Sequence, residues 1–261
     1  MFAFLRKILR QTAPDNAAQQ RRTRLALDPA RAPVYAIGDI HGCYAALVAL
    51  EDRIRQDIAR TGAGRPLIVY LGDYIDRGPD SRRVVEHLSG GSPADGIERI
   101  ALCGNHDDTF LRFLRDPAGN AAWLDFGGDA TLRSYGLGHL AHLRRPKELA
   151  RAADAIRAAV PREHVAFLES LPAMLVQGGR VFVHAGIRPG LPLDAQSDAD
   201  LLWIREPFLA EGPGLPITVI HGHTPGEEPV FGPGRIGIDT GCFATGRLTA
   251  LKLTETGAIL L

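Results

Sequence analysis

Five short apolar runs in this chain each end in polar or glycine residues of a kind that can bind metal or phosphate. Runs of this length and composition predict buried strands. In open α/β sheets ligands bind beyond the carboxyl ends of the strands, so these polar ends can meet in one crevice. The pattern therefore predicts an α/β fold with one site built from five strand ends. The runs are 34–37 before GDIHG, 67–71 before GDYIDRG, 100–103 before GNHD, 181–183 before HAG, and 217–220 before HGHTP.

The segments between and after these runs alternate between helical and strand-like patterns. Apolar residues at helical spacing predict helices that pack one face on the sheet. A long interval after the third run has only helical periodicity, so it predicts an excursion that covers one side of the site. The predicted segments are a crossover helix at 44–58, helices at 149–160 and 161–171 within an excursion at 107–171, and closing strands of a second sheet at 235–240 and 248–254.

A chain of 261 residues can bury one sizeable core, so we expect one catalytic domain at 33–261. Residues 1–32 are predicted to be a basic segment and linker, because the first 31 residues carry seven Lys and Arg against two Asp and Glu. Residues 1–12 place apolar side chains beside basic ones. They could dock weakly on an anionic membrane or a partner, or form a disordered tail, since so short a helix is marginal in water.

Charge and cysteine usage exclude several classes of protein. The formal net charge is zero, so no whole-molecule field gathers nucleic acid, and we expect none to bind. No apolar run approaches the roughly 18 residues that span a bilayer. Three cysteines are too few and too widely spaced for a disulfide framework, which favours a cytoplasmic location.

The polar ends of the runs carry side chains that bind metal ions. Asp39 and His41 stand two residues apart, so in extended backbone both leave on one face, and Asp73 has two carboxylate oxygens that can bridge two cations. Any one of these residues alone would be interpreted as a turn or cap residue, but the set together favours a metal site. Its oxygen and nitrogen donors suit manganese, iron or zinc better than calcium. The other candidate ligands are Asn105, His184 and His223.

In this order, the five motifs resemble the metallophosphoesterase superfamily and, within it, the bacterial and phage-type serine/threonine phosphatases of the phosphoprotein phosphatase family. The resemblance implies a four-layer α/β/β/α sandwich with two mixed β-sheets. It also implies two divalent metal ions, with manganese favoured and iron or zinc as alternatives. One ion would be held by Asp39, His41 and Asp73, and the second by Asp73, Asn105, His184 and His223.

The same resemblance implies which residues act on the substrate. His106 in GNHD matches the catalytic histidine of the family, and Asp76 matches its carboxylate partner. Arg77 matches an arginine that binds the substrate phosphate, and Arg205 in LLWIREPF matches a second one more loosely. Two cations lower the pKa of a bridging water, so the hydroxide formed there can attack phosphorus without a covalent enzyme intermediate.

Other residues near the motifs are interpreted as packing residues. His221 is assigned to the core, because the ligand of the family aligns with the second histidine of HGHTP. Trp123, Phe126 and Tyr135 flank the paired glycines of GGDATLRSYG and could pack locally or form a platform for the substrate. Local packing is the favoured interpretation, because large aromatic side chains usually contribute to a core.

These observations favour a protein serine/threonine phosphatase that acts on a phosphoprotein or a small phosphorylated substrate. A symmetrical diadenosine tetraphosphate hydrolase is the nearest alternative, since that enzyme shares the metal motifs. A non-catalytic phosphate-binding adaptor is an alternative of another class, but a binder would not need His106, Asp76 and Arg77 together. The chain has no evident counterpart of the extended docking surfaces of the eukaryotic enzymes, so we predict no obligate regulatory subunit.

Overall fold

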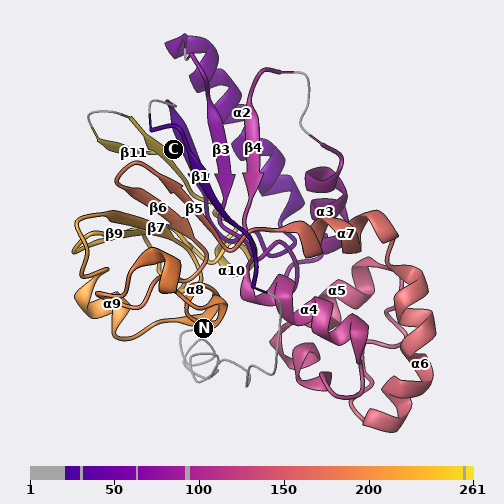
Figure 1. Ribbon diagram of the computed structural model, residues 1–261. Helices are drawn as coiled ribbons and strands as arrows, with labels where there is room; N and C mark the ends of the chain where they lie inside the picture. Colours follow the sequence, from indigo (N-terminus) through magenta and orange to yellow (C-terminus); the bar gives the residue numbers. More distant parts are fainter. Residues whose placement is uncertain (1–20, 30–31, 63, 92–94, 255–256) are drawn as a thin grey trace.

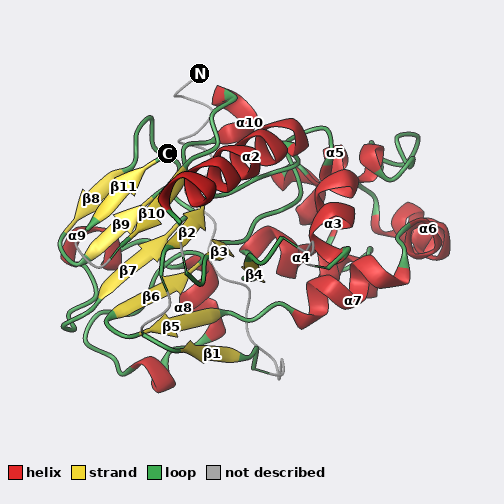
Figure 2. Ribbon diagram, turned by 90° about the horizontal axis from the view of Figure 1, so that it is seen from above, coloured by secondary structure: helices red, strands yellow, loops and turns green. Residues whose placement is uncertain are grey.

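Two β-sheets pack face to face in the structure, and helices cover the outer face of each (Figure 1 and Figure 2). Helices of the central part of the chain form a separate lobe at one side of the sheets. The predicted four-layer α/β/β/α fold with two mixed sheets is confirmed. The structure is a computed structural model, and it describes residues 21–29, 32–62, 64–91, 95–254 and 257–261.

Within the described residues, one sheet has five strands in the order β11-β10-β2-β3-β4. Its strands β2, β3 and β4 are parallel, whereas β10 runs antiparallel to both β2 and β11. Parallel neighbours need a crossover connection, and helices supply it after β2 and after β3. The strand bounds are β2 (Val34–Ile37), β3 (Leu67–Tyr70), β4 (Glu98–Ala101), β10 (Ala250–Leu253) and β11 (Ala258–Leu260).

The second sheet has six strands in the described part of the chain, in the order β1-β5-β6-β7-β9-β8. Neighbours β1 and β5, β6 and β7, and β7 and β9 are parallel, and the other two pairs are antiparallel. The strand bounds are β1 (Arg24–Leu27), β5 (Met174–Gln177), β6 (Arg180–Val183), β7 (Thr218–His221), β8 (Val230–Gly232) and β9 (Arg235–Gly237).

Helices connect the strands and cover the sheets. The crossover helix α2 is amphipathic as predicted, and its apolar side chains join the core below it. The predicted helices at 149–160 and 161–171 are present as α6 and α7. The bounds are α2 (Tyr44–Thr61), α3 (Ser81–Ser89), α4 (Asn105–Arg115), η1 (Ala121–Phe126), α5 (Gly128–Ser134), α6 (Pro146–Ala159), α7 (Arg162–Ser170), η2 (Leu193–Ala195), α8 (Asp198–Trp203), α9 (Phe208–Glu211) and α10 (Cys242–Thr245).

Alternation along β2 shows how the core divides into layers. Val34 and Ala36 belong to the apolar cluster between the two sheets, while Tyr35 and Ile37 belong to the cluster under the helices. A third cluster, which includes Phe208, covers the outer face of the six-stranded sheet. Because both faces of the central strands are buried, their sequences are continuously apolar, as the five runs predicted.

The predicted linker is wrong for residues 24–27. These residues form β1, which pairs in parallel with β5 from Arg24 opposite Met174 to Leu27 opposite Gln177. The surrounding arginines give this segment the composition of a linker, but its backbone completes an edge of the six-stranded sheet. The basic segment at 1–12, for which docking on a membrane or partner is predicted, lies outside the described residues.

Two other expectations need correction. The strands predicted at 235–240 and 248–254 do not share a sheet, because β9 pairs with β7 whereas β10 pairs with β2. An open edge of β2 is available to β10, and this pairing buries Ala250 and Leu251. The strand predicted at 100–103 is β4, which begins two residues earlier. No helix in the described ranges is both long and apolar enough to cross a membrane.

An ion pair between Lys252 on β10 and Asp57 on α2 links a helix to the sheet, and the Tyr35 hydroxyl also donates to Asp57, at 2.7 Å. Burial raises the pKa of Asp57, but hydrogen bonds from Lys252, Tyr35 and Arg60 outweigh it and lower this pKa to about 2. The charged pair therefore stabilises the fold above the unfolded pKa of about 3.9, and this stability is lost as the pH falls toward 2.

We expect Lys252→Met to lower the free energy of unfolding by roughly 3 kcal/mol at pH 7, because it leaves a buried carboxylate poorly compensated. The loss should shrink at pH 4, where Asp57 of the variant can take up a proton. Urea unfolding of Lys252→Met, Asp57→Asn and the double variant measures both effects. Strictly additive losses in the double variant would contradict a direct interaction.

Candidate metal centre and active site

Five strand ends bring the predicted ligands to one edge of the sandwich (Figure 1). Asp39 follows β2, Asp73 follows β3, and Asn105 begins α4 just after β4. His184 follows β6 and His223 follows β7, so the two sheets both contribute. All of these side chains are buried. The convergence expected from the sequence is therefore present in the structure.

Left-handed backbone conformation is concentrated at this site. Among the described residues other than glycine, five have a positive φ, and all five are predicted site residues. Such a conformation costs an L-residue about 1–2 kcal/mol, so the surrounding structure must impose it. The resulting sharp turns direct side chains of neighbouring loop residues toward the candidate metal centre. The residues are His41 (φ 44°), Asp73 (φ 54°), Asp76 (φ 72°), Arg77 (φ 67°) and His223 (φ 64°).

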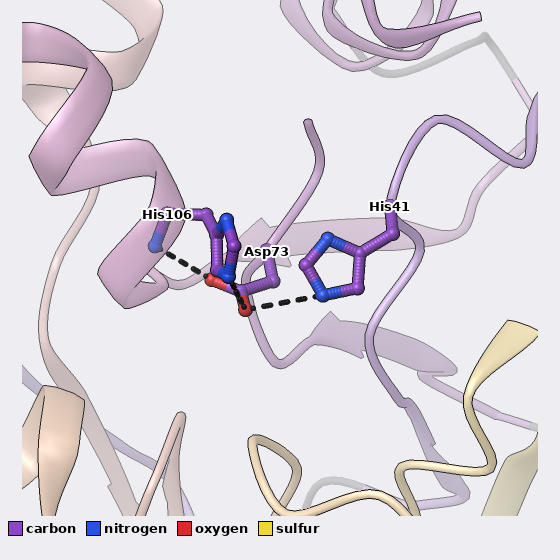
Figure 3. Close-up of side chains that lie close together, drawn as sticks. All are labelled: His41, Asp73 and His106. Atoms are coloured by element: carbon purple, nitrogen blue, oxygen red, sulfur yellow. Dashed lines mark hydrogen bonds and ion pairs between the residues drawn. The ribbon is translucent and has the colours of Figure 1, made fainter. Parts of the chain in front are cut away.

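One group of donor atoms lies around the Asp73 carboxylate. Figure 3 shows His41 and His106 on either side of it, with His41 Nε2 at 3.4 Å from Asp73 Oδ2. The Nδ1 atom of His41 donates to the Ile75 carbonyl at 2.7 Å, which leaves the Nε2 lone pair facing the site. This lone pair lies 2.9 Å from a guanidinium nitrogen of Arg77. The Nε2 atom and the carboxylate thus face positive charge, as ligands of a cation would.

A second group of donor atoms surrounds the Asn105 side chain. Its Oδ1 atom lies 2.8 Å from His184 Nε2 and 2.9 Å from His223 Nδ1. The Nδ1 atom of His184 donates to the Leu71 carbonyl at 3.0 Å, so its Nε2 lone pair faces Asn105 Oδ1 and also Asp73 Oδ1 at 3.5 Å. Lone pairs that face one another without a proton between them repel, and a bound cation removes the repulsion. The donor set therefore fits divalent metal ions.

The charges of the site point to the same conclusion. Burial raises the pKa of Asp39 and Asp73 well above the usual range, and neighbouring carboxylates add to the effect, Asp239 on Asp39 and Asp107 on Asp73. Burial lowers the pKa of His184 to about 3, which keeps its imidazole neutral and able to bind metal. Buried acidic side chains beside neutral imidazoles are stabilised by cations. Asp239 follows β9 outside the five motifs, so its place beside Asp39 is not predicted from the sequence.

Asp39 and the loop after β7 are held together by a different contact. The backbone N–H of His223 donates to both carboxylate oxygens of Asp39, at 3.1 Å each. Gly222 makes this approach possible, because a Cβ there would lie 2.0 Å from Asp39 Oδ1. The contact joins a strand end of one sheet to a strand end of the other. A larger residue at 222 would separate the two halves of the metal centre.

Asp107, in the GNHD motif, holds the loop after β3 against the start of α4. Its buried carboxylate accepts hydrogen bonds from the backbone N–H groups of Asp73 and Gly104 at 2.9 Å and of Tyr74 at 3.1 Å. Gly72 allows the two loops to touch, because a Cβ there would lie 2.5 Å from the Gly104 nitrogen. Asp107 has no role predicted from the sequence, although its place inside the GNHD motif is a signal that could have indicated one.

His106 and Asp76 form a hydrogen-bonded pair, with His106 Nδ1 at 2.6 Å from Asp76 Oδ2. Trp123 donates its Nε1–H to the same oxygen at 2.8 Å, and Thr131 donates its hydroxyl to the other oxygen at 2.6 Å. Burial raises the pKa of Asp76 to about 8, against these hydrogen bonds, and burial lowers the pKa of His106 well below its usual range. Trp123 is predicted from the sequence to be a packing residue and Thr131 is not predicted at all, whereas both orient Asp76.

Two arginines bring positive charge to the site. The Arg77 guanidinium lies 2.9 Å from His41 Nε2 and 3.0 Å from His106 Nε2. Burial lowers the pKa of Arg205, and the charge of Arg77 lowers it further, while Asp73 opposes both effects. No described residue accepts a hydrogen bond from the buried Nε atom of Arg205. Two guanidiniums that repel each other, one with an unpartnered N–H, can bind an anion such as phosphate.

The structure thus brings all the predicted ligands, the predicted catalytic pair and both predicted phosphate-binding arginines into one region. His221 lies beside it, with its Nδ1 atom 3.1 Å from the Gly222 carbonyl oxygen and its ring against Phe208. Its position agrees with the interpretation of His221 as a core residue. The roles of the site residues in catalysis remain predictions.

Comparison with known proteins gives a match to the calcineurin-like phosphoesterase family over residues 32–244. The asymmetrical bis(5'-nucleosyl)-tetraphosphatase PrpE of Geobacillus thermodenitrificans is 28% identical over 239 residues, which cover 84% of this chain and 89% of that protein. A symmetrical bis(5'-nucleosyl)-tetraphosphatase of Methylococcus capsulatus is 30% identical over 156 residues, which cover 60% of this chain and 44% of that protein.

Solved structures with the same fold have more varied activities. A putative diadenosine tetraphosphatase has a TM-score of 0.61 at 24% identity, over 92% of this chain and 97% of that one. A serine/threonine phosphatase of Saccharomyces cerevisiae has a TM-score of 0.55 at 14% identity, over 92% of this chain and 83% of that one. At these identities the likeness shows the fold alone.

We expect Asp73→Asn to reduce the bound metal, because one of its oxygens faces His41 and the other faces His184. Elemental analysis after dialysis against manganese should give about two ions per wild-type chain and clearly fewer in the variant. Asp154→Asn is the matched control, since this aspartate is fully exposed on α6. Equal metal content in Asp73→Asn and wild type would contradict a bridging role.

Proposed function

The chain belongs to the calcineurin-like phosphoesterase family, and from this premise we propose that it is a metal-dependent hydrolase of bis(5'-nucleosyl) tetraphosphates. The observation that carries the proposal is the pair of arginines beside the buried ligands, with the Arg205 Nε atom free to donate. Such a pair suits a substrate with several linked phosphates. Relatives that match most of the chain support this substrate class, since their names record it for those proteins.

The comparisons favour the dinucleotide substrate over the phosphoprotein substrate that the sequence motifs favoured. The serine/threonine phosphatase is similar in fold alone. The sequence of PrpE from Geobacillus thermodenitrificans aligns with 84% of this chain, at 28% identity. The relatives with this coverage are named asymmetrical, so we expect the asymmetrical cut rather than the symmetrical one first considered. A non-catalytic adaptor would have no use for the oriented pair of His106 and Asp76.

Different residues of the chain have different roles in the proposed hydrolysis. The six candidate ligands would hold divalent ions, which would supply an acidified water and neutralise developing negative charge. Arg77 and Arg205 hold phosphate oxygens, which orients the phosphorus for in-line attack. Asp76 accepts from His106 Nδ1, fixes the ring and stabilises its protonated form, in which the Nε2–H would donate a proton to the leaving oxygen. Trp123 and Thr131 keep Asp76 in place.

Manganese is the metal that we propose for this donor set, with iron and zinc as alternatives. The cytoplasmic location, the lack of nucleic-acid binding and the lack of an obligate regulatory subunit stay predictions. Each can be tested separately from the reaction itself.

The decisive assay incubates purified protein and manganese with diadenosine tetraphosphate and separates the products by ion-exchange chromatography. An asymmetrical cut gives ATP and AMP, and a symmetrical cut gives two ADP. We expect ATP and AMP, with activity abolished by prolonged chelation and restored by manganese. Phosphoserine peptides are the competing substrate class. Faster turnover of the peptides, in kcat/KM, would refute the proposal and restore the protein phosphatase interpretation.

A second prediction concerns His106 as the acid for the leaving group. Protonation matters most when the leaving oxygen is strongly basic, as in an alkyl phosphate, and less when a nucleotide phosphate leaves. We expect His106→Asn to lower kcat by about 10²–10⁴ on an alkyl phosphate such as glycerol phosphate or a phosphoserine peptide. The loss on diadenosine tetraphosphate should be clearly smaller.

Asp76→Asn should show the same contrast more mildly, because the imidazole stays in place but is less well oriented. Metal content must be unchanged in both variants, since a lost ion would depress every substrate. If metal is retained and both substrates slow by the same factor, His106 does not protonate the leaving group.

A further inference from the structure

Two half-buried phenylalanines lie beside the catalytic centre, and neither is accounted for by the chemistry above. Phe243, in α10, lies edge to face with His41, with ring centroids 5.5 Å apart. Phe126, the last residue of η1, lies edge to face with His106, with centroids 6.3 Å apart. His41 and His106 are themselves 4.7 Å apart (Figure 3). The four rings therefore contact one another in the order Phe243, His41, His106 and Phe126.

Arg77 connects these rings to the phosphate site. Its guanidinium lies 4.9 Å from the centre of the Phe243 ring, while its nitrogens bond both histidines. Its backbone N–H donates to the carbonyl of Gly127, the residue after Phe126, at 3.1 Å. A Cβ at Gly127 would lie 2.8 Å from the Arg77 nitrogen, so the loop that carries Phe126 is pressed against Arg77. Arg77 therefore contacts the Phe243 ring directly and the loop that carries Phe126 through its backbone.

Packing accounts for these two rings only in part. Phe243 is in none of the three apolar clusters formed by the described residues, and Phe126 packs only at the edge of the helical one. Both side chains keep some of their surface exposed next to charged groups. A phenylalanine needed only for stability would be expected to bury its ring in the core. Partly exposed rings beside a phosphate site are suited to stack on flat groups of a ligand.

A bis(5'-nucleosyl) tetraphosphate has such a group at each end of its phosphate chain. We propose that Phe126 and Phe243 are stacking platforms for the nucleobases of this substrate and so determine its selection over simple phosphates. The inference rests on the proposed function and names the residues that recognise the ends of the substrate. Stacking on a nucleobase would thus replace local packing, which is the role that the sequence favours for Phe126.

Steady-state kinetics of Phe243→Ala, Phe126→Ala and the double variant test the platforms. Stacking of one base on an aromatic side chain corresponds to about 5- to 150-fold in affinity, so we expect KM for diadenosine tetraphosphate to rise by roughly this factor in each single variant. The value of kcat should change less than about threefold, because the groups that act on phosphorus are untouched. Inorganic tetraphosphate, which has no bases, should keep its competitive inhibition constant within about twofold.

Matched variants separate stacking from structural effects. Phe243→Trp keeps a flat ring and should restore KM, whereas Phe243→Leu keeps apolar volume and should not. Phe167→Ala is the control of the same residue type, because Phe167 is a half-buried ring on α7 whose aromatic contact is with the Tyr74 ring and not with a histidine of the site. It should leave both KM and kcat as in wild type. Metal content is measured in every variant, because Phe243 touches the ligand His41.

Each outcome decides between specific alternatives. A loss of kcat or of tetraphosphate binding in Phe243→Ala would show that the ring positions His41 or Arg77, and it would overturn the proposal. Unchanged KM for the dinucleotide in the double variant would also overturn it, while the proposed function would stand. A wild-type enzyme without dinucleotide turnover would remove the proposed function and the platforms together.

Discussion

The hydrogen bonds accepted by Asp107 are the constraint on which the site depends. One buried carboxylate binds backbone N–H groups of Asp73, Tyr74 and Gly104, so it fixes the loop after β3 against the start of α4. The Asp73 carbonyl in turn accepts from the backbone N–H of His41 at 2.8 Å, which ties in the loop after β2. Three neighbouring strand ends are thereby held in one arrangement before any ligand binds. Preorganisation of this kind keeps donor atoms in place without further loss of chain entropy.

The strained loops are possible because the sandwich below them is rigid. Five left-handed residues at about 1–2 kcal/mol each would be a large cost for a typical domain, whose net stability is only about 5–15 kcal/mol. Central strands buried on both faces supply the compensating stability and leave the loops no alternative path. Among the described residues other than glycine, the strain is confined to residues of the candidate site. The positions of the site residues therefore depend on the rigidity of the two sheets.

Local patterns in the sequence predict most of the fold and the ligands, because each motif is a strand followed at once by its functional residues. The same reasoning fails where partners come from distant segments. Trp123 and Thr131 lie 47 and 55 residues from Asp76, and only the packing of the helical lobe brings them there. The pairing of β10 with β2 depends on which sheet edge is open. Strand β1 is not predicted, because the arginines around it give the segment the composition of a linker. Asp239 is likewise placed by tertiary contact with Asp39 rather than by a motif.

The proposed function assigns different tasks to the residues at strand ends and to the residues of the segments between strands. The candidate metal ligands come from loops at strand ends, whereas Arg205 follows α8, Phe243 lies in α10, and Phe126 belongs to the helical lobe. The two layers are coupled through Trp123, which orients Asp76 and stands three residues before Phe126 in the same short helix. A change that moves η1 to suit another substrate would therefore also disturb the orientation of His106. In the proposed reaction, selection of the substrate and proton transfer would both depend on η1, so a change in this helix would affect both.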